Sequence, residues 1–228
     1  MIAPVERRLW AAVGALFLAY VVLVFAGTAF QDALMLGDHA DKARDALISS
    51  SLSKNLAGGY LQVLGSLAFL VGALLLARLL RGREEIGDWL TACIGSAAVV
   101  STALTFATGY AAGAAALYDG HHGAPLATVT AVNDIRTVGF GLSAAVDGVL
   151  VLAASAAMLR SPLMPRWLGY AGCAVGLLGI AAVPAMRTGV ANVATMLWFT
   201  WVAVVAIVAI RMPRSAVSTG SMHQPVEA

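Results

Sequence analysis

The stretch that decides the fold is residues 127–159, ATVTAVNDIRTVGFGLSAAVDGVLVLAASAAML, an apolar run with an acidic residue, Asp147, deep inside it. A helix needs about 20 apolar residues to cross a bilayer, and this run is longer. Five more apolar stretches of crossing length accompany it, at residues 9–30, 59–80, 89–116, 167–185 and 189–210. None shows the short alternating pattern of barrel strands, so the backbone must satisfy its own polar groups as helices. The sequence therefore predicts an all-α, polytopic membrane protein, a bundle of six transmembrane helices.

The composition is typical of a chain that lies in lipid. Of the residues, 60% are hydrophobic and 11% are charged, against roughly 25% charged in a soluble domain. The lipid bilayer is therefore the main expected partner. The formal net charge is +2 and the bases are spread over short turns, not along one stripe, so we expect no nucleic-acid partner.

The distribution of Lys and Arg over alternate loops predicts how the chain is threaded, because cytoplasmic loops carry the excess of bases. One side would hold nine: Arg7, Arg8, Arg78, Arg81, Arg83, Arg160, Arg166, Arg211 and Arg214. The other would hold five: Lys42, Arg44, Lys54, Arg136 and Arg187. We therefore expect both termini in the cytoplasm. The first apolar run, about 18 residues, is longer than the roughly 7 to 15 of a signal peptide, so it should remain as an uncleaved helix.

The chain is organised as one transmembrane domain with a polar fringe. We expect residues 1–211 to form the six-helix domain and residues 212–228, rich in Ser, Pro and Gly, to be a disordered cytoplasmic tail. The longest insertion, the outer loop 31–58, has a weak apolar stripe behind a charged face. This pattern predicts a helix lying in the outer membrane interface.

Prolines and glycines indicate how the helices run and pack. Pro184 is the only proline that touches a predicted span, so the spans should be continuous, unlike the broken helices of many transporters. Gly109 with Gly113, and Gly172 with Gly176, form GxxxG patterns that let helix backbones approach closely. Packing inside the bundle is the favoured interpretation, and a homo-oligomer through these small-residue faces is the alternative.

Asp147 is the acidic residue that hydropathy places deep in the membrane. An ionised Asp there costs at least roughly 2.5 to 3.5 kcal/mol, so it should face the bundle interior and be paired, hydrated or protonated. Arg136, Ser143 and Asp147 all project within about 20° of one direction when 100° is counted per residue, forming one polar stripe. Arg136 nevertheless lies about 16 Å away along the axis, which excludes a direct ion pair within this helix.

Two interpretations of the stripe are open. In the functional one it lines a polar cavity open to the outside, with Asp147 as proton acceptor or cation ligand and Arg136 gathering an anionic group. The candidate ligand-binding residues are Gln62, Asn133, Arg136, Ser143 and Asp147. In the structural interpretation a protonated Asp147 bonds to a polar group on a neighbouring span; the candidates are Gln62, Thr102, Thr105 and Asn192. Asn133 and Asp134 lie near the start of the fourth span, where capping competes with a ligand or catalytic role.

Histidine and cysteine positions argue against a metal or a cofactor. His39, His121 and His122 fall in outer loops and His223 in the tail, whereas transmembrane haem needs His on facing helices. Cys93 and Cys173 lie on different spans, with no CxxC pair that would build a zinc or redox site. Nucleotide-binding and hydrolase motifs are absent in a usable context. We therefore expect no metal site, no cofactor and no disulfide.

The segment RSPLMPRWLGYAGCAVGLLGI, residues 160–180, resembles the corresponding stretch of an uncharacterised family of six-helix bacterial membrane proteins, many of them actinobacterial, known as a domain of unknown function. The long outer loop after the first helix and the order of the spans extend the likeness over most of the chain. The resemblance implies the fold, the topology and a location in the bacterial plasma (inner) membrane. It brings no catalytic residues with it.

Two classes of function fit these features. The first is a membrane module that binds or passes a small lipophilic ligand, or supports a partner protein, through the polar site around Asp147. The second is an intramembrane enzyme that acts on a lipophilic substrate, with Asp147 or Asp134 as general acid or base. The absence of a catalytic motif favours the first class and leaves enzyme status undecided.

Overall fold

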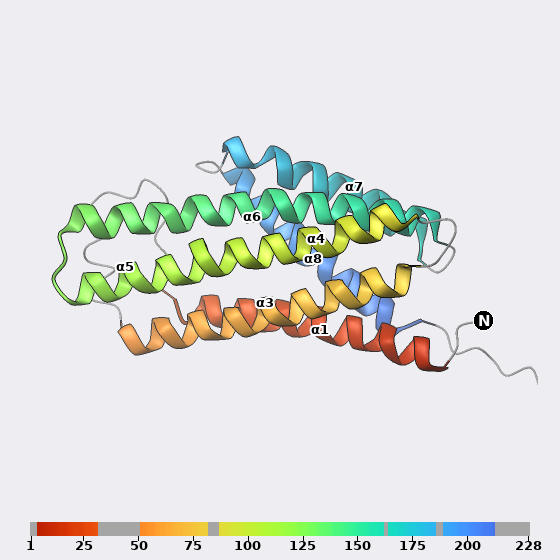
Figure 1. The fold of residues 1–228 in the computed structure, drawn as a ribbon, viewed down its shortest axis with the longest axis horizontal. Coiled ribbons are helices and arrows are strands. Elements are labelled where there is room, and N and C mark those ends of the chain that lie inside the picture. Colours follow the sequence, from red (N-terminus) through yellow and green to blue (C-terminus); the bar gives the residue numbers. More distant parts are fainter. Residues whose placement is uncertain (1–3, 32–50, 82–86, 162–163, 186–188, 213–228) are drawn as a thin grey trace, which may run out of the picture.

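The computed structural model describes residues 4–31, 51–81, 87–161, 164–185 and 189–212. Every element in these ranges is helical, which confirms the all-α prediction. The elements are α1 (Pro4–Ala29), α3 (Leu52–Leu80), α4 (Asp88–Leu104), the π-helix η1 (Thr105–Ala111), α5 (Ala112–His121), α6 (Leu126–Arg160), α7 (Arg166–Ala181), the 3-10 turn η2 (Val183–Ala185) and α8 (Gly189–Ile210). They lie side by side along one long axis (Figure 1).

Five helical runs are long and apolar enough to cross a membrane. They are Val5–Ala29, Leu52–Leu80, Asp88–His121, Leu126–Arg160 and Val190–Ile210. The predicted fifth span instead forms α7, which has 16 residues and is followed by η2. A straight crossing takes about 20 residues, so six crossings remain a prediction.

The third run is continuous but not uniform. Helices α4 and α5 are joined end to end by η1, so that Asp88–His121 is one rod of 34 residues without a proline. It packs along α6, which has 35 residues, and their connection forms the end of the molecule farthest from the N-terminus (Figure 1). The sequence predicted unbroken helices, and the path is unbroken. The π-helical geometry of the seven residues of η1 is the departure from that prediction.

Local signals explain where several helices start. The Ser51 hydroxyl caps α3 by accepting a hydrogen bond from the backbone N–H of Lys54 at 3.4 Å. Pro125 and Pro165 precede α6 and α7, where a proline does not cost a helical hydrogen bond. Gly123 has φ of 78° in the turn before α6, a conformation that favours glycine. Residues 32–50 of the predicted interfacial segment and residues 213–228 of the predicted tail lie outside the described residues.

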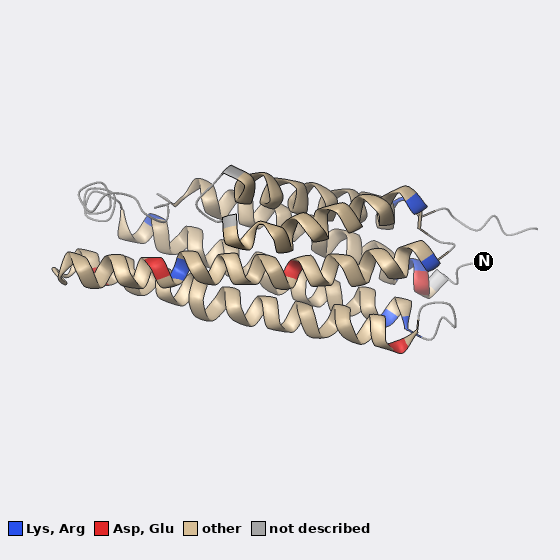
Figure 2. Ribbon diagram, turned by 90° about the horizontal axis from the view of Figure 1, so that it is seen from above, with Lys and Arg blue, Asp and Glu red and all other residues tan. Residues whose placement is uncertain are grey.

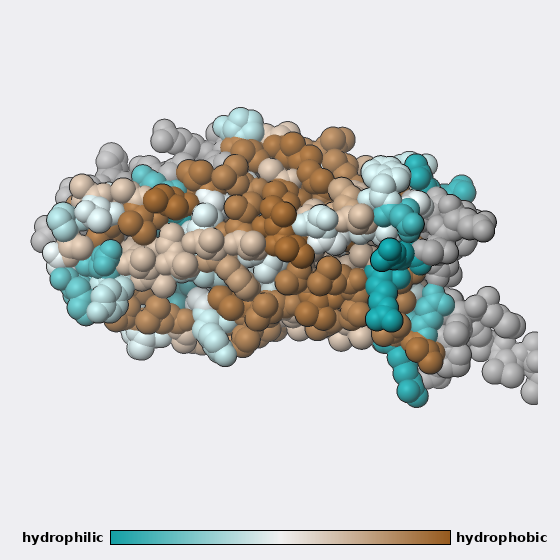
Figure 3. Space-filling view, viewed as in Figure 1, coloured by the Kyte–Doolittle hydropathy of each residue, from teal (hydrophilic) through white to brown (hydrophobic). Residues whose placement is uncertain are grey.

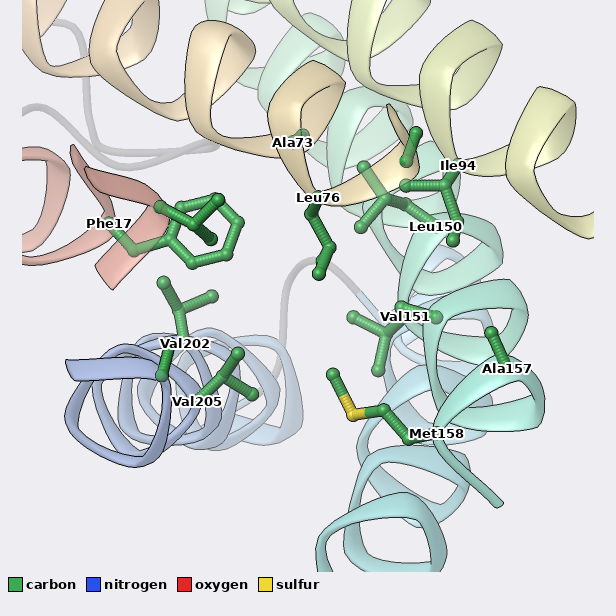
Figure 4. Packing of buried hydrophobic residues seen from close by; sticks show 14 of the residues in the cluster. Phe17, Ala73, Leu76, Ile94, Leu150, Val151, Ala157, Met158, Val202 and Val205 are labelled. Carbon is green, nitrogen blue, oxygen red and sulfur yellow. The ribbon is translucent and has the colours of Figure 1, made fainter. Parts of the chain in front are cut away.

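The core is packed where α1, α3, α4, α6 and α8 meet. Figure 4 shows Leu76 of α3 pointing between Phe17 on one side and Leu150 and Val151 on the other. Because lipid is as apolar as these side chains, helix association in a bilayer depends on close van der Waals contact more than on a hydrophobic driving force.

Glycines make several of these contacts close. A methyl group on Gly176 of α7 would lie 2.8 Å from the carbonyl oxygen of Gly148 on α6. One on Gly109 would lie 3.0 Å from the ring of Phe140, and one on Gly113 would lie 2.8 Å from Cδ of Arg136. The GxxxG faces therefore pack against helices of the same chain.

The surface is arranged as a bilayer requires. Apolar side chains cover the middle of the face in Figure 3, and hydrophilic ones gather toward its two ends. Large apolar residues stay exposed along α1, α3 and α8, including Val22, Phe25, Leu67, Val71 and Ile207. The chain is therefore a multi-pass helical protein with a membrane-like exterior.

Basic residues concentrate at one end of the bundle. The start of α1, the end of α3, the start of α4, the end of α6, the start of α7 and the end of α8 share the end where the N-terminus lies (Figures 1 and 2). The described bases on these termini are Arg7, Arg8, Arg78, Arg81, Arg160, Arg166 and Arg211. Arg81 lies 3.9 Å from Asp88 across the α3–α4 connection, an exposed pair of little energetic weight.

Candidate functional site

The site is centred on Asp147, which α6 turns toward the interior. Its neighbour Gly148 is buried against α7, where a methyl group would lie 2.7 Å from the carbonyl oxygen of Gly176. Adjacent residues of a helix project about 100° apart, so Asp147 points away from α7 and toward α4. There the Ser101 hydroxyl donates a hydrogen bond of 2.6 Å to Oδ1 of Asp147.

Asp147 borders a cavity of about 540 Å³ that lies among all the long helices. One wall, from α4, η1 and α6, is rich in hydroxyl groups and carries the carboxyl group. Its polar members are Ser101, Thr102, Thr105, Tyr110, Thr137, Ser143 and Asp147. The opposite wall, from α1, α3 and α8, carries the aromatic rings of Tyr20, Phe69, Trp198 and Phe199 beside the polar Ser66, Asn192 and Thr195. The cavity is therefore amphipathic.

The aromatic wall is a connected cluster. The ring centroid of Tyr20 lies 4.9 Å from that of Phe69 and 5.5 Å from that of Phe199. Phe69 meets Trp198 edge to face at 5.5 Å. Trp198 Nε1 donates a hydrogen bond of 3.2 Å to the hydroxyl oxygen of Tyr20, which fixes both rings. The rings of this wall therefore face the cavity in several different orientations, and their mutual contacts hold them in place.

Asp147 and Thr102 each bring to the cavity a polar atom that has no partner among the described residues. Oδ2 of Asp147 has no hydrogen-bond partner among the described residues, whereas Oδ1 is held by Ser101. The hydroxyl of Thr102 is buried, with 5% of the residue exposed, and it too has no partner in that part of the chain. Buried polar groups normally have partners, so the Thr102 hydroxyl calls for water or a ligand, while Oδ2 of Asp147 is available to a molecule in the cavity.

The cavity reaches the surface near the start of α8. Asn192 and Thr195 line it and are both exposed residues. They lie within the first two turns of α8, which begins at Gly189. The described part of the cavity's opening is therefore at this level of α8.

A second hollow, of about 260 Å³, lies farther along α6 toward its start. It contains Arg136 and Asn133 of α6 with Asn55 and Gln62 of α3. Gln62 Nε2 donates to the Thr28 hydroxyl at 2.9 Å, and Asn133 is 8% exposed. Phe140 and Tyr110 line both hollows, and their rings meet edge to face at 6.1 Å. They stand between the Asp147 cavity and the Arg136 hollow.

The predicted site residues are therefore divided between two places. Asp147 and Ser143 line the larger cavity, where the Ser143 hydroxyl donates to the backbone oxygen of Phe140 at 2.9 Å. Gln62, Asn133 and Arg136 line the smaller hollow. Asp134, the second candidate acid, is exposed and lines neither.

The partner of Asp147 is a residue that the sequence did not single out. Thr102, Thr105 and Asn192 do line the cavity, but Ser101 makes the hydrogen bond. Gln62 bonds to Thr28 instead. Tyr110 of η1, whose hydroxyl lies 3.3 Å from that of Ser66, was also missed. A hydroxyl run in the third span was the available signal, and it does not say which hydroxyl faces α6.

Histidines and cysteines lie outside this site. No group of three or more His, Cys, Asp or Glu side chains that could hold a metal ion occurs within the described ranges. His122 stacks on Tyr118 with centroids 3.9 Å apart, while His39 and His223 fall outside those ranges. Cys93 and Cys173 are free thiols on α4 and α7.

Comparison with known proteins gives a family. Residues 12–211 match the model of a domain of unknown function, DUF4386. The chain belongs to this family. The match confirms the resemblance noted in the sequence, and it spans α1 to α8, so both hollows of this DUF4386 member lie within the family domain. No curated protein and no solved structure matches the chain.

Proposed function

We propose that this DUF4386 protein crosses the bacterial plasma membrane six times, with both termini cytoplasmic, and binds a small lipophilic molecule in the cavity around Asp147. A single observation carries the binding part. The carboxyl group of Asp147 keeps one oxygen without a partner on the wall of a cavity of about 540 Å³ inside an apolar bundle. Cavities of roughly 300 to 1,000 Å³ with a few convergent polar groups are typical of small-molecule sites.

Energetics support a functional role for this acid. An ionisable side chain inside a membrane bundle costs at least roughly 2.5 kcal/mol, and such residues commonly mark ligand or ion pathways. A purely structural acid would pack against its donor without empty space beside it. Here the Ser101 bond leaves the other oxygen facing the cavity.

Charge and length support the threading. Seven described bases lie on helix termini at one end of the bundle, which the positive-inside rule assigns to the cytoplasm. Helix α7 is too short alone, but with η2 it forms a segment from Arg166 to Ala185, close to the roughly 20 residues of one crossing.

The enzymatic alternative has less support. Asp134 lies outside the cavity, and Asp147 is the only carboxyl group among the described residues that line it, so no second carboxyl group faces it there. Incubation of lipid extracts with the wild type and with Asp147→Asn tests this alternative. A product formed only by the wild type would favour it over simple binding.

Cysteine labelling tests the threading. In a chain with Cys93→Ala and Cys173→Ala, single cysteines are introduced at His122 and at Trp89, which are exposed at opposite ends of the bundle. A membrane-impermeant thiol reagent added to intact cells should label His122→Cys and spare Trp89→Cys. Labelling of Trp89→Cys alone would reverse the proposed orientation.

Native mass spectrometry of protein extracted in mild detergent tests the binding. We expect a co-purified small molecule in the wild type and its loss in Ala194→Phe, because Ala194 lines the cavity and a benzyl group would fill part of it. Ala15→Phe, on the exposed face of α1, is the matched control and should keep the molecule. An equal adduct in both variants would place the ligand elsewhere and contradict the proposal.

A further inference from the structure

We propose that the cavity takes a lipophilic organic cation, with its positive group between the Asp147 carboxylate and the aromatic wall. This inference rests on the proposed binding function and names the class of ligand. It is carried by three features of the cavity: the sign of its charge, the chemistry of the wall that faces the charge, and the absence of a competing base among the described residues of its lining.

The described lining of the cavity carries charge of one sign only. Its lining residues include one carboxyl group, Asp147, and no Lys, Arg or His within the described part of the chain. The Ser101 hydroxyl holds Oδ1 in place and leaves Oδ2 available. An ionised carboxylate in an apolar bundle is compensated best by an opposite charge in direct contact. A neutral ligand could donate one hydrogen bond but would leave the charge uncompensated.

The opposite wall suits the same charge. Tyr20, Phe69, Trp198 and Phe199 supply π-faces, and the attraction of a cation to such faces strengthens when water is excluded. The tilted and edge-to-face contacts within this cluster, at 4.9 to 5.5 Å, leave ring faces that are not all covered by other rings. Aromatic surface also binds the apolar body of an amphipathic ligand.

Arg136, the basic residue of the polar stripe, does not line the Asp147 cavity. Arg136 lines the smaller hollow and not the Asp147 cavity, and Phe140 and Tyr110 stand between the two spaces. The guanidinium group therefore does not occupy the position that a cationic ligand would take beside Asp147. The described residues at the mouth, Asn192 and Thr195, carry neutral polar side chains that can solvate a cation.

A matched pair of probes isolates the charge. Benzyltrimethylammonium and neopentylbenzene have the same shape and differ in one atom, a cationic nitrogen in place of a carbon. Neither donates a hydrogen bond, so a difference in affinity reports on charge alone. Both are small beside a cavity of about 540 Å³. Affinities are measured on the full chain in uncharged detergent by titration calorimetry, with melting temperature as a second readout.

We expect the cation to bind the wild type at least tenfold more tightly than the neutral probe, a ratio that corresponds to about 1.4 kcal/mol. Asp147→Asn should weaken the cation by about ten- to hundredfold and leave the neutral probe nearly unchanged, because only the charge is lost. Asp147→Glu keeps the charge and should keep the preference. Phe199→Leu should weaken the cation several-fold, since a ring face is removed.

The control is Asp134→Asn, which removes the same charge from the exposed face of the same helix. It should leave both affinities unchanged, and an effect equal to that of Asp147→Asn would overturn the inference by showing only general charge attraction. Equal binding of the two probes, abolished by Ala194→Phe, would also overturn it while the cavity stays a binding site. If neither probe binds and the purified chain carries no adduct, the proposed function fails as well.

Discussion

The contact between α6 and α7 can be tested by a single substitution, because it depends on Gly148, a residue without a side chain. In Gly148→Ala, the new methyl group would lie 2.7 Å from the backbone oxygen of Gly176 and 2.8 Å from Cγ1 of Ile180. The first neighbour is backbone and cannot rotate away. The two helices must therefore move apart next to Asp147.

The magnitude follows from two opposing effects. Overpacking of a well-packed site costs about 1 to 3 kcal/mol, while Ala is favoured over Gly in a helix by up to about 1 kcal/mol. Gly179→Ala on α7 measures the effect of helix propensity without overpacking, because the nearest neighbour of its methyl group would be the Ala144 backbone oxygen at 3.5 Å, an ordinary contact. We expect Gly148→Ala to be less stable than Gly179→Ala by about 1 to 3 kcal/mol.

The assay is reversible unfolding in mixed micelles with increasing sodium dodecyl sulfate, followed by tryptophan fluorescence. Trp201 is a suitable reporter because its Nε1 donates to the backbone oxygen of Leu168 on α7 at 3.1 Å. Equal stability of the two variants, or a more stable Gly148→Ala, would mean that α6 and α7 do not meet at this glycine. The arrangement that turns Asp147 toward α4 would then be wrong.

Two further predictions use the same assay. Thr102→Val replaces a buried hydroxyl that has no partner in the described structure and should stabilise the protein by up to about 1 kcal/mol; a loss of stability would mean that the hydroxyl is bonded. A double-mutant cycle of Ser101→Ala with Asp147→Ala should give a coupling of about 0.6 kcal/mol, the average for hydrogen bonds between membrane helices, and at most about 1.7 kcal/mol. Independent effects of the two changes would contradict the 2.6 Å bond.

The inward direction of Asp147 could be predicted because the cost of a charge in lipid is large and depends on local sequence alone. Its partner could not. Ser101 and Thr102 are adjacent on α4 and project about 100° apart. Which of the two reaches Asp147 depends on how far α4 is rotated about its axis, and that rotation is set by packing along the whole rod.

The division of the polar stripe shows a second limit. Arg136 and Asp147 do project in similar directions, as helical periodicity predicts. Direction on one helix does not say which neighbour lies there, and the neighbours change along the axis. Arg136 meets residues of α3 and α5, whereas Asp147 meets α4 and faces a space bounded also by α7 and α8.

The π-helix was missed for a related reason. Absence of proline predicts an unbroken helix but says nothing about an extra residue in one turn. Within η1, the Thr108 hydroxyl bonds to the backbone oxygen of Leu104 at 2.7 Å, and Gly109 receives the ring of Phe140 from α6. Contacts with another helix, which local sequence does not encode, accompany the unusual turn.

The extra residue in η1 changes the direction in which side chains project along the rod Asp88–His121. A π turn inserts one residue, so every later side chain is advanced by roughly 100° compared with a regular helix. The same rod can then aim hydroxyls of α4 at the carboxyl group of Asp147 and, beyond η1, aim Gly113 at Arg136. Deletion of one residue inside η1 would shorten the rod by only about 1.5 Å, yet it would swing all of α5 around its axis. The small defect therefore sets the angular offset between the two hollows of the protein.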